Sequence, residues 1–329
     1  MIDKLDESAT PCWLSCFKEK RAIYKHDEHF TLSWKYFINT FGSEPLLKKY
    51  LWNLGLLLAK PEAIESGKGI FIRDILRDAG YQLLAVKRLN IDAEKTGHLW
   101  RYAKGRYTEE RFQLLVELME SGSSVLFVLK DSQYDERLPL SIRLTNFKGS
   151  TDPRDRSRDS LRAVCGGIQS VFLNYIHTSD EPCDVVRELG ILFDSTELQA
   201  LLRAIKSGDQ GAGGGYASDP LTPEFGYALS DVDSMGRIQA ALAQIPNSEI
   251  RRKASFALAS CFSGNRDDAL LVIELLKNWQ LEVFKIDEIV IRSKAIAMKR
   301  ENKSQDFPTC EISHWNAYAS YMENNNPLL

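Results

Sequence analysis

The stretch Asn174-Tyr175-Ile176-His177-Thr178-Ser179-Asp180 carries a histidine among polar neighbours that can orient its imidazole ring. We expect this histidine at the rim of a junction between a strand and a helix. A lone histidine is more often a packed or a surface residue than a catalytic one. The polar residues that flank this stretch, and their order along the chain, therefore determine how it is interpreted.

These flanking residues form an ordered set on both sides of His177. In chain order the set comprises Leu56-Leu57-Leu58-Ala59-Lys60-Pro61-Glu62, Gly149-Ser150-Thr151-Asp152-Pro153, Arg162, Asn174, His177, Ser179, Asp180, Glu188 and Phe193. In residue type, order and approximate spacing, the set resembles the nucleoside diphosphate kinase family. The resemblance covers about residues 53 to 195, a little under half of the chain, and is most specific where Asn-x-x-His-x-Ser-Asp is followed by Glu188.

The apolar pattern of this region predicts alternating strands and helices. Strands are expected at 53–59, 81–89, 123–129 and 168–173, and helices at 69–79, 93–104, 109–120 and 182–192. Such alternation predicts an open sheet covered by helices but does not determine the strand order. The resemblance implies the finer fold class, α+β, with a four-stranded antiparallel sheet of the ferredoxin-like type.

The resemblance also implies a role for each matching polar residue. His177 would be the catalytic nucleophile, and histidine suits phosphoryl transfer because its pKa lies near neutrality without a large shift. Glu188 would hold one ring nitrogen so that the other can attack. The remaining matches would bind the nucleotide: Lys60 and Arg162 through its phosphates, Thr151 through a hydroxyl hydrogen bond, and Asn174 through the ribose.

Several positions depart from the family pattern. Lys60-Pro61-Glu62-Ala63 stands where Lys-Pro-Asp-Gly is usual, Thr178 replaces a glycine, and His177 lies two residues further from Arg162 than expected. Three further nucleotide-binding residues are assigned across shifts in the alignment. They are Arg143 as a second phosphate-binding arginine, Phe112 as the base-stacking aromatic, although Arg111 is the nearest ungapped match, and Tyr102 as a tyrosine near the phosphates. The nucleoside pocket is thus more diverged than the nucleophile.

Composition limits the partners that the protein can have. Its net charge of -3 gives no general attraction to nucleic acid or to an anionic membrane. The arginines at 154, 156 and 158 are interleaved with aspartates, which makes a nucleic-acid role unlikely. No apolar run approaches the ~20 residues that span a bilayer, and no secretory signal is evident. We therefore expect a cytoplasmic protein.

The six cysteines are scattered along the chain, which favours reduced thiols over a disulfide framework. Cys12 and Cys16, with His26 and His29 after them, could be interpreted as a zinc site, but their spacing is not that of the common zinc modules. The alternative is a buried cysteine pair on a short helix followed by a solvated turn. We predict no protein-bound metal site.

The chain divides by composition into four parts. Residues 1–50 are predicted to be an aromatic-rich extension that packs on the core, and 51–205 the kinase-like domain. Residues 206–229 are rich in glycine and proline and are interpreted as a linker, since the ending of a phosphate-binding P-loop is missing. Residues 230–329 are predicted to be a helical domain, with Trp315, Tyr318 and Tyr321 as possible docking points.

Two hypotheses for function follow. The first is a phosphotransferase that moves the γ-phosphoryl group of a nucleoside triphosphate to a nucleoside diphosphate through a phosphohistidine on His177. Magnesium would be bound through the phosphates, with no metal cage in the protein. The alternative is a nucleotide-binding regulatory module whose helical domain binds a protein partner. Related enzymes are oligomers, so the resemblance also implies a homo-oligomer.

Overall fold

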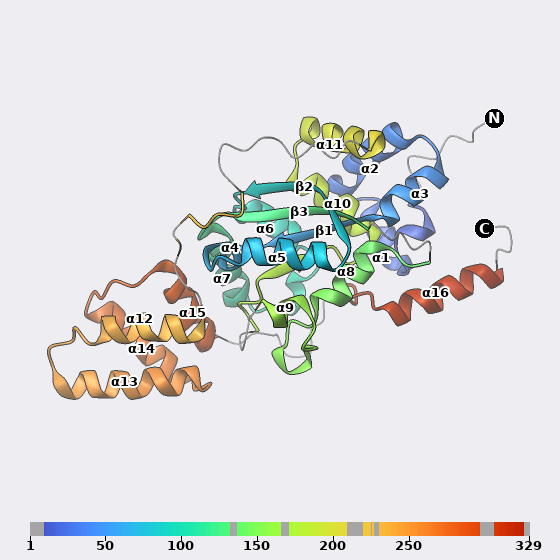
Figure 1. Cartoon of the computed structure of the whole chain (residues 1–329). Helices are drawn as coiled ribbons and strands as arrows, with labels where there is room; N and C mark the ends of the chain where they lie inside the picture. The colour runs from blue at the N-terminus through green and yellow to red at the C-terminus, as the bar shows by residue number, and fades with distance from the viewer. Residues whose placement is uncertain are drawn as a thin grey trace.

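The centre of the molecule is an antiparallel sheet of four strands (Figure 1). The computed structural model describes residues 10–131, 137–165, 171–208, 220–224, 226, 230–296 and 306–325. The strands are β1 (Leu54–Ala59), β2 (Tyr81–Leu89), β3 (Ser124–Asp131) and β4 (Ile176–Thr178), in the order β2-β3-β1-β4. This arrangement confirms the predicted ferredoxin-like α+β fold.

The fourth strand lies elsewhere than its prediction at 168–173. Residues 166–170 are outside the described part of the chain, and Val171, Phe172 and Leu173 form no strand. The strand that pairs with β1 is Ile176–Thr178, so His177 itself belongs to the sheet. The apolar residues at 171–173 misled the prediction, because Phe172 and Leu173 pack against helices instead of lying in a ladder.

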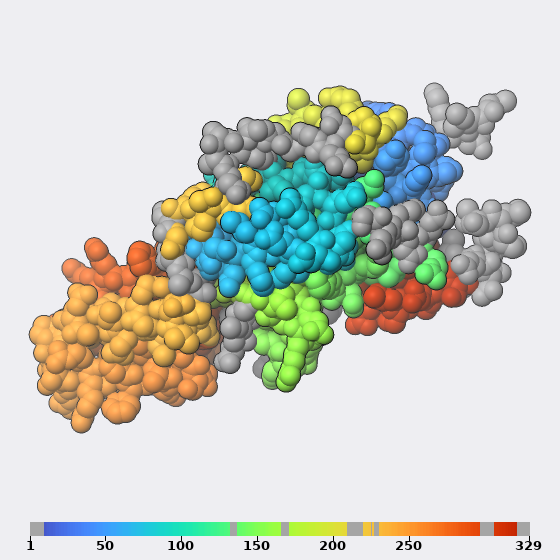
Figure 2. All heavy atoms as spheres, viewed as in Figure 1, coloured from blue at the N-terminus to red at the C-terminus, as the bar shows by residue number. Residues whose placement is uncertain are grey.

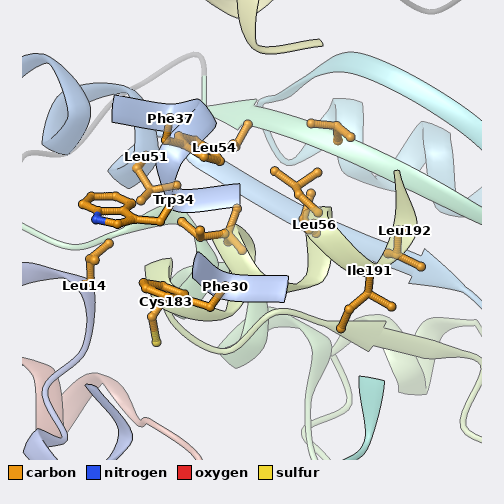
Figure 3. Close-up of a cluster of buried hydrophobic side chains, with 14 of the residues drawn as sticks. Leu14, Phe30, Trp34, Phe37, Leu51, Leu54, Leu56, Cys183, Ile191 and Leu192 are labelled. Atoms are coloured by element: carbon orange, nitrogen blue, oxygen red, sulfur yellow. The ribbon is translucent and has the colours of Figure 1, made fainter. Parts of the chain in front are cut away.

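Strand β1 explains how both faces of the sheet are covered. Side chains alternate along a strand, so Leu54, Leu56 and Leu58 face one side, and Leu57 and Ala59 the other. All six residues of β1 are buried, as the continuous apolar run requires. Figure 3 shows Leu54 and Leu56 in the larger of the two cores, together with Phe30, Trp34 and Phe37.

Two sets of helices form these cores. The larger core uses α2 (Glu28–Phe41), α3 (Glu44–Trp52), α6 (Ala93–Leu99), α7 (Glu109–Glu120), α10 (Pro182–Leu192) and α11 (Ser195–Ser207). The opposite face is covered by α4 (Pro61–Glu65), α5 (Lys68–Asp78), α8 (Leu140–Lys148) and α9 (Leu161–Val164). Helix α2 begins at Glu28, because Asp27 caps it by accepting hydrogen bonds from the N–H groups of His29 and Phe30.

Helix α2 from the N-terminal region packs directly on α10. Gly190 makes this close approach possible, since a Cβ there would collide with the Ser33 hydroxyl and the His29 carbonyl. The two helices are also joined by a buried ion pair, in which Arg187 donates to Asp27 over 2.8 Å. The N-terminal region is therefore continuous with the main core through α2.

The predicted ends of helices and strands agree with the structure where the apolar pattern is uninterrupted, and differ from it where the pattern is broken. Helices α7 and α10 and strand β2 coincide with their predicted ranges. Helix α6 ends at Leu99, five residues before the predicted end, and a short 3₁₀ turn, η2 (Lys104–Arg106), follows. Trp100 terminates α6 with a non-helical backbone, and its ring turns toward the sheet.

Four helices form a second unit beyond the sheet. They are α12 (Asp231–Leu242), α13 (Ser248–Phe262), α14 (Arg266–Asn278) and α15 (Lys285–Ala295), and they pack around a core of their own. Figure 2 shows them as an orange lobe at one end of the molecule. Helix α15 connects the lobe to α7, where Glu117 accepts hydrogen bonds from Lys285 and Arg292 over 2.8 and 2.6 Å.

The C-terminal residues return from this lobe to the main core. Helix α16 (Ile312–Asn325) lies at the opposite end of the molecule from α12–α15 (Figure 1). Trp315 is only 1% exposed and packs edge-on against Trp52, with ring centroids 5.5 Å apart. Tyr318 donates a hydrogen bond to the carbonyl of Cys12 over 3.0 Å. The tail therefore contacts the N-terminal region instead of the helical lobe.

Most of the glycine- and proline-rich segment 206–229 lies outside the described residues, as does the side chain of Tyr321. Within the described residues, none of the helices combines the length and the apolar character needed to cross a bilayer.

Candidate functional site

A cleft of about 1180 Å³ opens beside β4, and it collects most of the residues singled out from the sequence. Its wall includes Lys60, Tyr102, Thr151, Arg162, Asn174, His177 and Glu188. These come from the end of β1, the loops around α6 and α9, strand β4 and helix α10. The fold thus brings together residues that lie more than a hundred positions apart in the sequence.

Strand pairing determines which way His177 points. His177 lies opposite Leu58 in the antiparallel ladder, so both side chains are on the face that α10 covers. Nε2 of His177 is 2.9 Å from Oε1 of Glu188, on the second turn of α10. With its proton on Nε2, the imidazole donates this hydrogen bond. The other ring nitrogen, Nδ1, then has no hydrogen-bond partner among the described residues.

Glu188 is itself held in one orientation. Its second oxygen accepts a hydrogen bond from the Ser179 hydroxyl over 2.7 Å, so both carboxylate oxygens have a partner. Burial, the largest influence, works to raise the pKa of Glu188, but His177 and the two hydrogen bonds outweigh it and lower the pKa below its ordinary value. Glu188 is therefore a carboxylate at neutral pH and can fix the tautomer of His177.

Trp100 covers one side of the His177 ring. The two ring centroids are 5.3 Å apart with an interplanar angle of 58°. Trp100 follows directly after α6, whose last turn reaches toward α10 through the hydrogen bond from Arg187 to the carbonyl of His98. The sequence offered no signal for this contact, because the two residues lie 77 positions apart.

Lys60 lies at the end of β1 and is only 2% exposed. Its ammonium is 2.6 Å from Oε1 of Glu62, and the same oxygen accepts a hydrogen bond from the backbone N–H of Tyr175 over 3.1 Å. Burial is the largest influence on Lys60 and lowers its pKa from the ordinary value, although Glu62 opposes the shift. Glu62, which departs from the family pattern, therefore connects the lysine to the segment that precedes His177.

Tyr175 adopts a left-handed backbone, with φ of 60°, although it is not a glycine. Such a conformation costs on the order of 1–3 kcal/mol and persists only where the surroundings hold it. Here its carbonyl accepts a hydrogen bond from the N–H of Lys60 over 2.9 Å, and its side chain is buried in the smaller core. This turn sets the position at which β4 begins, and hence the position of His177.

Arg162 holds the loop opposite Lys60. Nη1 donates to the Gly149 carbonyl and the Thr151 hydroxyl over 2.9 and 3.1 Å, and Nη2 donates to Asn174 Oδ1 and the Ile176 carbonyl over 3.3 and 2.7 Å. Burial is the main reason that the pKa of Arg162 falls to about 10, and the nearby Arg156 adds to the effect. Arg162 thus contacts both Thr151 and Asn174 on the cleft wall.

Lys148 is a cation on the cleft wall that the sequence reasoning missed. It directly precedes the polar turn that begins at Gly149, and this position was the available signal. Its ammonium lies 3.3 Å from Oδ1 of Asp180, which also accepts a hydrogen bond from Thr145 over 3.2 Å. Burial is the largest influence on both charged groups; it lowers the pKa of Lys148, whereas for Asp180 the neighbouring cations overcome it and lower the pKa of the carboxyl.

Two of the residues assigned across alignment shifts are not brought to the cleft. Arg143 forms an ion pair with Asp131 at the end of β3. Phe112 packs with Tyr107 and Val116, and Lys104 lies over its ring at 4.4 Å. Neither residue lines the cleft, because successive residues of α7 and α8 point in different directions and a shift of one position moves a side chain to another face.

Arg111 and Tyr102 are the residues of this region that do line the cleft. The Arg111 guanidinium stacks over the Tyr107 ring at 4.0 Å, so the nearest ungapped match, and not Phe112, occupies this wall. Tyr102 donates its hydroxyl proton to Asp27 Oδ2 over 2.8 Å and thereby faces the N-terminal region. Burial and then this hydrogen bond raise the pKa of Tyr102 to about 12, so it remains protonated at neutral pH.

One wall of the cleft is made by parts of the chain outside the resembling region. From the N-terminal region come Lys20 and Tyr24, and from the tail come residues 307–313. Lys20 is buried between Glu181 and Asp184 at 2.9 and 2.6 Å, and Tyr24 donates to Asp184 over 2.6 Å. The N-terminal region therefore contacts the start of α10, whose N-cap Glu181 lies seven residues before Glu188.

Comparison with known proteins identifies the family of the central part of the chain. The family model "Nucleoside diphosphate kinase" matches residues 54–198. The nucleoside diphosphate kinase of Aquifex aeolicus is 32% identical over 143 residues, which is 44% of this chain and 95% of that protein. The chain belongs to the nucleoside diphosphate kinase family. The helical lobe and most of the terminal regions lie outside the part that matches this family.

Two other similarities complete the comparison. Thioredoxin domain-containing protein 6 of Xenopus laevis is 27% identical over 144 residues, and the chain covers 22% of the length of that relative and 43% of its own. A crystal structure of the Aquifex aeolicus nucleoside diphosphate kinase aligns with a TM-score of 0.37 at 29% identity, covering 44% of this chain and 96% of that one. Membership of the nucleoside diphosphate kinase family thus rests on the sequence matches.

Proposed function

We propose that the protein transfers the γ-phosphoryl group of a nucleoside triphosphate to a nucleoside diphosphate through a phosphohistidine on His177. The observation that carries the proposal is the geometry of the imidazole. Nε2 is 2.9 Å from the Glu188 carboxylate on the wall of a cleft, which leaves Nδ1 as the nitrogen available for attack. A merely structural histidine has no need of a buried carboxylate that is itself held by a serine.

In the first half-reaction, Nδ1 attacks the γ-phosphorus. The bond from that phosphorus to the bridging oxygen of the β-phosphate breaks, and the nucleoside diphosphate leaves. Glu188 stabilises the positive charge that develops on the imidazole. In the second half-reaction, a terminal oxygen of another nucleoside diphosphate attacks the phosphohistidine and restores the free histidine.

Cations of the cleft wall would stabilise the transferring phosphoryl group. Lys60 and Arg162 lie on the wall with His177, and Lys148 adds a third positive charge. Charge spreads over the equatorial oxygens of the phosphorus in the transition state, so fixed cations there lower the barrier. Lys60 and Arg162 would exchange some of their present partners, Glu62 and the loop carbonyls, for phosphate oxygens.

Magnesium would enter with the nucleotide and supply charge neutralisation at the phosphates. The cation prefers oxygen ligands and usually retains several waters. Asp180 fits this need, because its carboxylate lies on the cleft wall and its pKa is lowered by Lys148 against the opposing effect of burial. We propose that Asp180 faces the hydrated cation, while phosphate oxygens provide the direct ligands.

The proposal is tested by recording the intact mass of the protein after incubation with ATP and magnesium. We expect the gain of one phosphoryl group, its loss on addition of GDP, and no gain in His177→Ala. His26→Ala is the matched control, since His26 is an exposed histidine outside the cleft. Absence of any phosphoryl gain in a protein that binds ATP would overturn the phosphotransferase.

One observation favours the second candidate, a nucleotide-responsive regulatory module. The Lys60 ammonium is already paired with Glu62 at 2.6 Å, and a phosphate must compete with this buried carboxylate. If that competition fails, nucleotide would bind without transfer, and the helical lobe would carry the function through a protein partner. Glu62→Gln discriminates between the candidates: restored or faster transfer in this variant would support a kinase restrained by Glu62, whereas binding without transfer in both forms supports the module.

The remaining sequence-based expectations are proposals of the same kind. We propose the division at about residues 50, 205 and 230, a homo-oligomer, and a cytoplasmic location. Light scattering of the full chain, together with a chain that ends near residue 208, tests whether the helical lobe or the kinase-like part determines assembly.

A further inference from the structure

Two cysteine thiols from opposite ends of the chain meet at the wall of the cleft. Sγ of Cys16 and Sγ of Cys310 are 3.3 Å apart, although the residues are separated by 294 positions. Both are free thiols, and Cys310 is among the residues that line the cleft. A disulfide has an S–S distance of about 2.05 Å, so the sulfurs would have to approach by about 1.2 Å.

Neighbouring residues hold the segments that carry Cys16 and Cys310 in this position. The N–H of Cys16 donates to Oε1 of Glu181 over 2.8 Å, while Ser15 and Lys20 donate to Oε2, each over 2.9 Å. On the other side, buried Trp315 holds the helix that begins two residues after Cys310. Both cysteines lie just outside helices.

The two thiols differ in their exposure to solvent. Cys16 is half-buried, whereas Cys310 is only 2% exposed. The hydrogen bond with Cys16, followed by burial, raises the pKa of the Cys310 thiol well above its ordinary value. A reagent from solution therefore meets Cys16 first, and Cys310 is positioned to react with whatever forms on Cys16.

We propose that Cys16 and Cys310 are a redox modification site whose reversible disulfide fixes the tail across the cleft. The oxidant is a low-molecular-weight disulfide such as oxidised glutathione. The Cys16 thiolate attacks one sulfur of that disulfide, which forms a mixed disulfide and releases one thiol. The hydrogen bond that raises the pKa of Cys310 is lost with the Cys16 thiol, so Cys310 can give up its proton. It then attacks Sγ of Cys16, which forms the protein disulfide and releases the second thiol. Two protein protons are lost, and the two electrons reside on the reduced glutathione.

The cross-link has a consequence for the cleft. Residues 307–313 form part of its wall and include the first two residues of α16. In the reduced protein this segment is held by packing and hydrogen bonds alone, whereas the disulfide would join it covalently to the N-terminal region. We expect slower opening of the tail and, resting on the proposed function, slower exchange of bound nucleotide.

The test begins with peptide mapping of the full chain under non-reducing conditions after treatment with oxidised glutathione. We expect a linked pair of peptides containing Cys16 and Cys310, which disappears after reduction. Cys12→Ser is the matched control, because Cys12 is also half-buried and lies four residues from Cys16. That variant should still form the link, whereas Cys310→Ser should retain glutathione on Cys16.

Hydrogen exchange of residues 306–325 then measures the closure without any nucleotide. We expect the exchange to slow several-fold on oxidation and to recover on reduction, in the wild type and Cys12→Ser but not in Cys310→Ser. Failure to form the linked peptide, or a link that leaves the exchange unchanged, would overturn the proposal. Retention of zinc by the thiols with Glu181, which are close enough to share an ion, would also overturn it.

These readouts are separate from the proposed function. If the linked peptide and the slower hydrogen exchange appear but no phosphoryl group is gained from ATP, the redox site stands and the phosphotransferase fails. If phosphoryl transfer occurs but no link forms, the reverse holds. Dissociation of a fluorescent ATP analogue from the oxidised and reduced protein then tests the effect on nucleotide exchange.

Discussion

The two walls of the cleft differ in origin and in chemistry. The reacting wall, defined by Lys60, Arg162, His177 and Glu188, comes from the part of the chain that matches the family. The added wall, defined by Lys20, Tyr24 and residues 307–313, comes from outside that part. On the reacting wall a ring nitrogen points at no protein partner among the described residues, whereas Lys20 and Tyr24 of the added wall are bound to carboxylates. The difference suggests that the terminal regions brace and enclose a site whose reactive groups they do not supply.

The largest expected effect comes from removing the nucleophile on the reacting wall. His177→Ala should lower the rate of phosphoryl exchange between ATP and GDP by roughly 10⁴-fold or more, since the loss of a covalent nucleophile is among the most damaging changes to an enzyme. Steady-state exchange assays at saturating nucleotide measure the effect. If the variant keeps a tenth of the activity, His177 is not the residue that accepts the phosphoryl group.

A substitution in α16, the helix that continues from the added wall, should change stability and not chemistry. Trp315→Ala removes a side chain that is 1% exposed and should lower the free energy of unfolding by about 3–5 kcal/mol. Trp279→Ala is the control, because this tryptophan is 39% exposed on the helical lobe and should change stability by about 0.5 kcal/mol or less. Urea denaturation gives both values. Equal effects of the two substitutions on the free energy of unfolding would mean that the tail is not part of the main core.

A substitution at Glu188 tests how the reacting wall supports its nucleophile. Glu188→Gln keeps the size of the side chain but removes the charge that stabilises the imidazolium, so exchange should fall about 10- to 100-fold, the range for carboxylates that orient a metal-binding histidine. The maximal rate should change more than the Michaelis constant for ATP, because Glu188 contacts the histidine and not the nucleotide. An unchanged maximal rate would make the carboxylate a structural partner only.

Substitution of Lys148 should have a smaller effect, on the Michaelis constant for ATP. Lys148→Met removes a cation from the cleft wall and should raise the Michaelis constant for ATP about tenfold, the equivalent of one charged hydrogen bond of about 1.5 kcal/mol. Lys148→Arg should retain most of the affinity. Initial-rate measurements over a range of ATP concentrations decide the matter, and identical constants in all three proteins would exclude Lys148 from phosphate binding.

The smallest effect concerns the contact that joins the two walls. Burial works to raise the pKa of Asp27, but Arg187 overcomes it and holds the pKa below the ordinary value of about 3.9. Ionised Asp27 therefore stabilises the fold above that value, and this contribution is lost as the pH falls through the lower pKa of the folded state. The difference in unfolding free energy between the wild type and Asp27→Asn should be constant near neutrality and shrink below about pH 3.9. Urea titrations between pH 7 and pH 3 measure it, and a difference that grows with acid would contradict this assignment.

The sequence predicted the helices and strands whose apolar pattern runs without a break. Helices α7 and α10 and strand β2 have clear ends, such as Pro182 at the start of α10. Strand β4 was missed because three residues carry too little pattern, and the left-handed Tyr175 before it has no signature in a single sequence. Periodicity describes local burial, so it fails where a short edge strand is defined by its partner.

The candidate site likewise contains residues that the sequence predicted and residues that it did not. His177, Glu188, Lys60, Arg162, Thr151 and Asn174 were predicted from an ordered motif, and the fold places them on one cleft. Arg143 and Phe112 were assigned across alignment shifts, and each lies away from the cleft. The contacts of Trp100 and Cys310 could not have been predicted, because long-range packing alone brings them to the wall.

The most direct test of the account is to determine which nitrogen of His177 carries the phosphoryl group. The phosphorus NMR spectrum of the protein after reaction with ATP and magnesium distinguishes Nδ1-phosphohistidine from the Nε2 isomer. The account predicts phosphorylation on Nδ1, because Nε2 is held by Glu188 at 2.9 Å. A phosphoryl group on Nε2, or on a residue other than His177, would contradict the role assigned to the reacting wall.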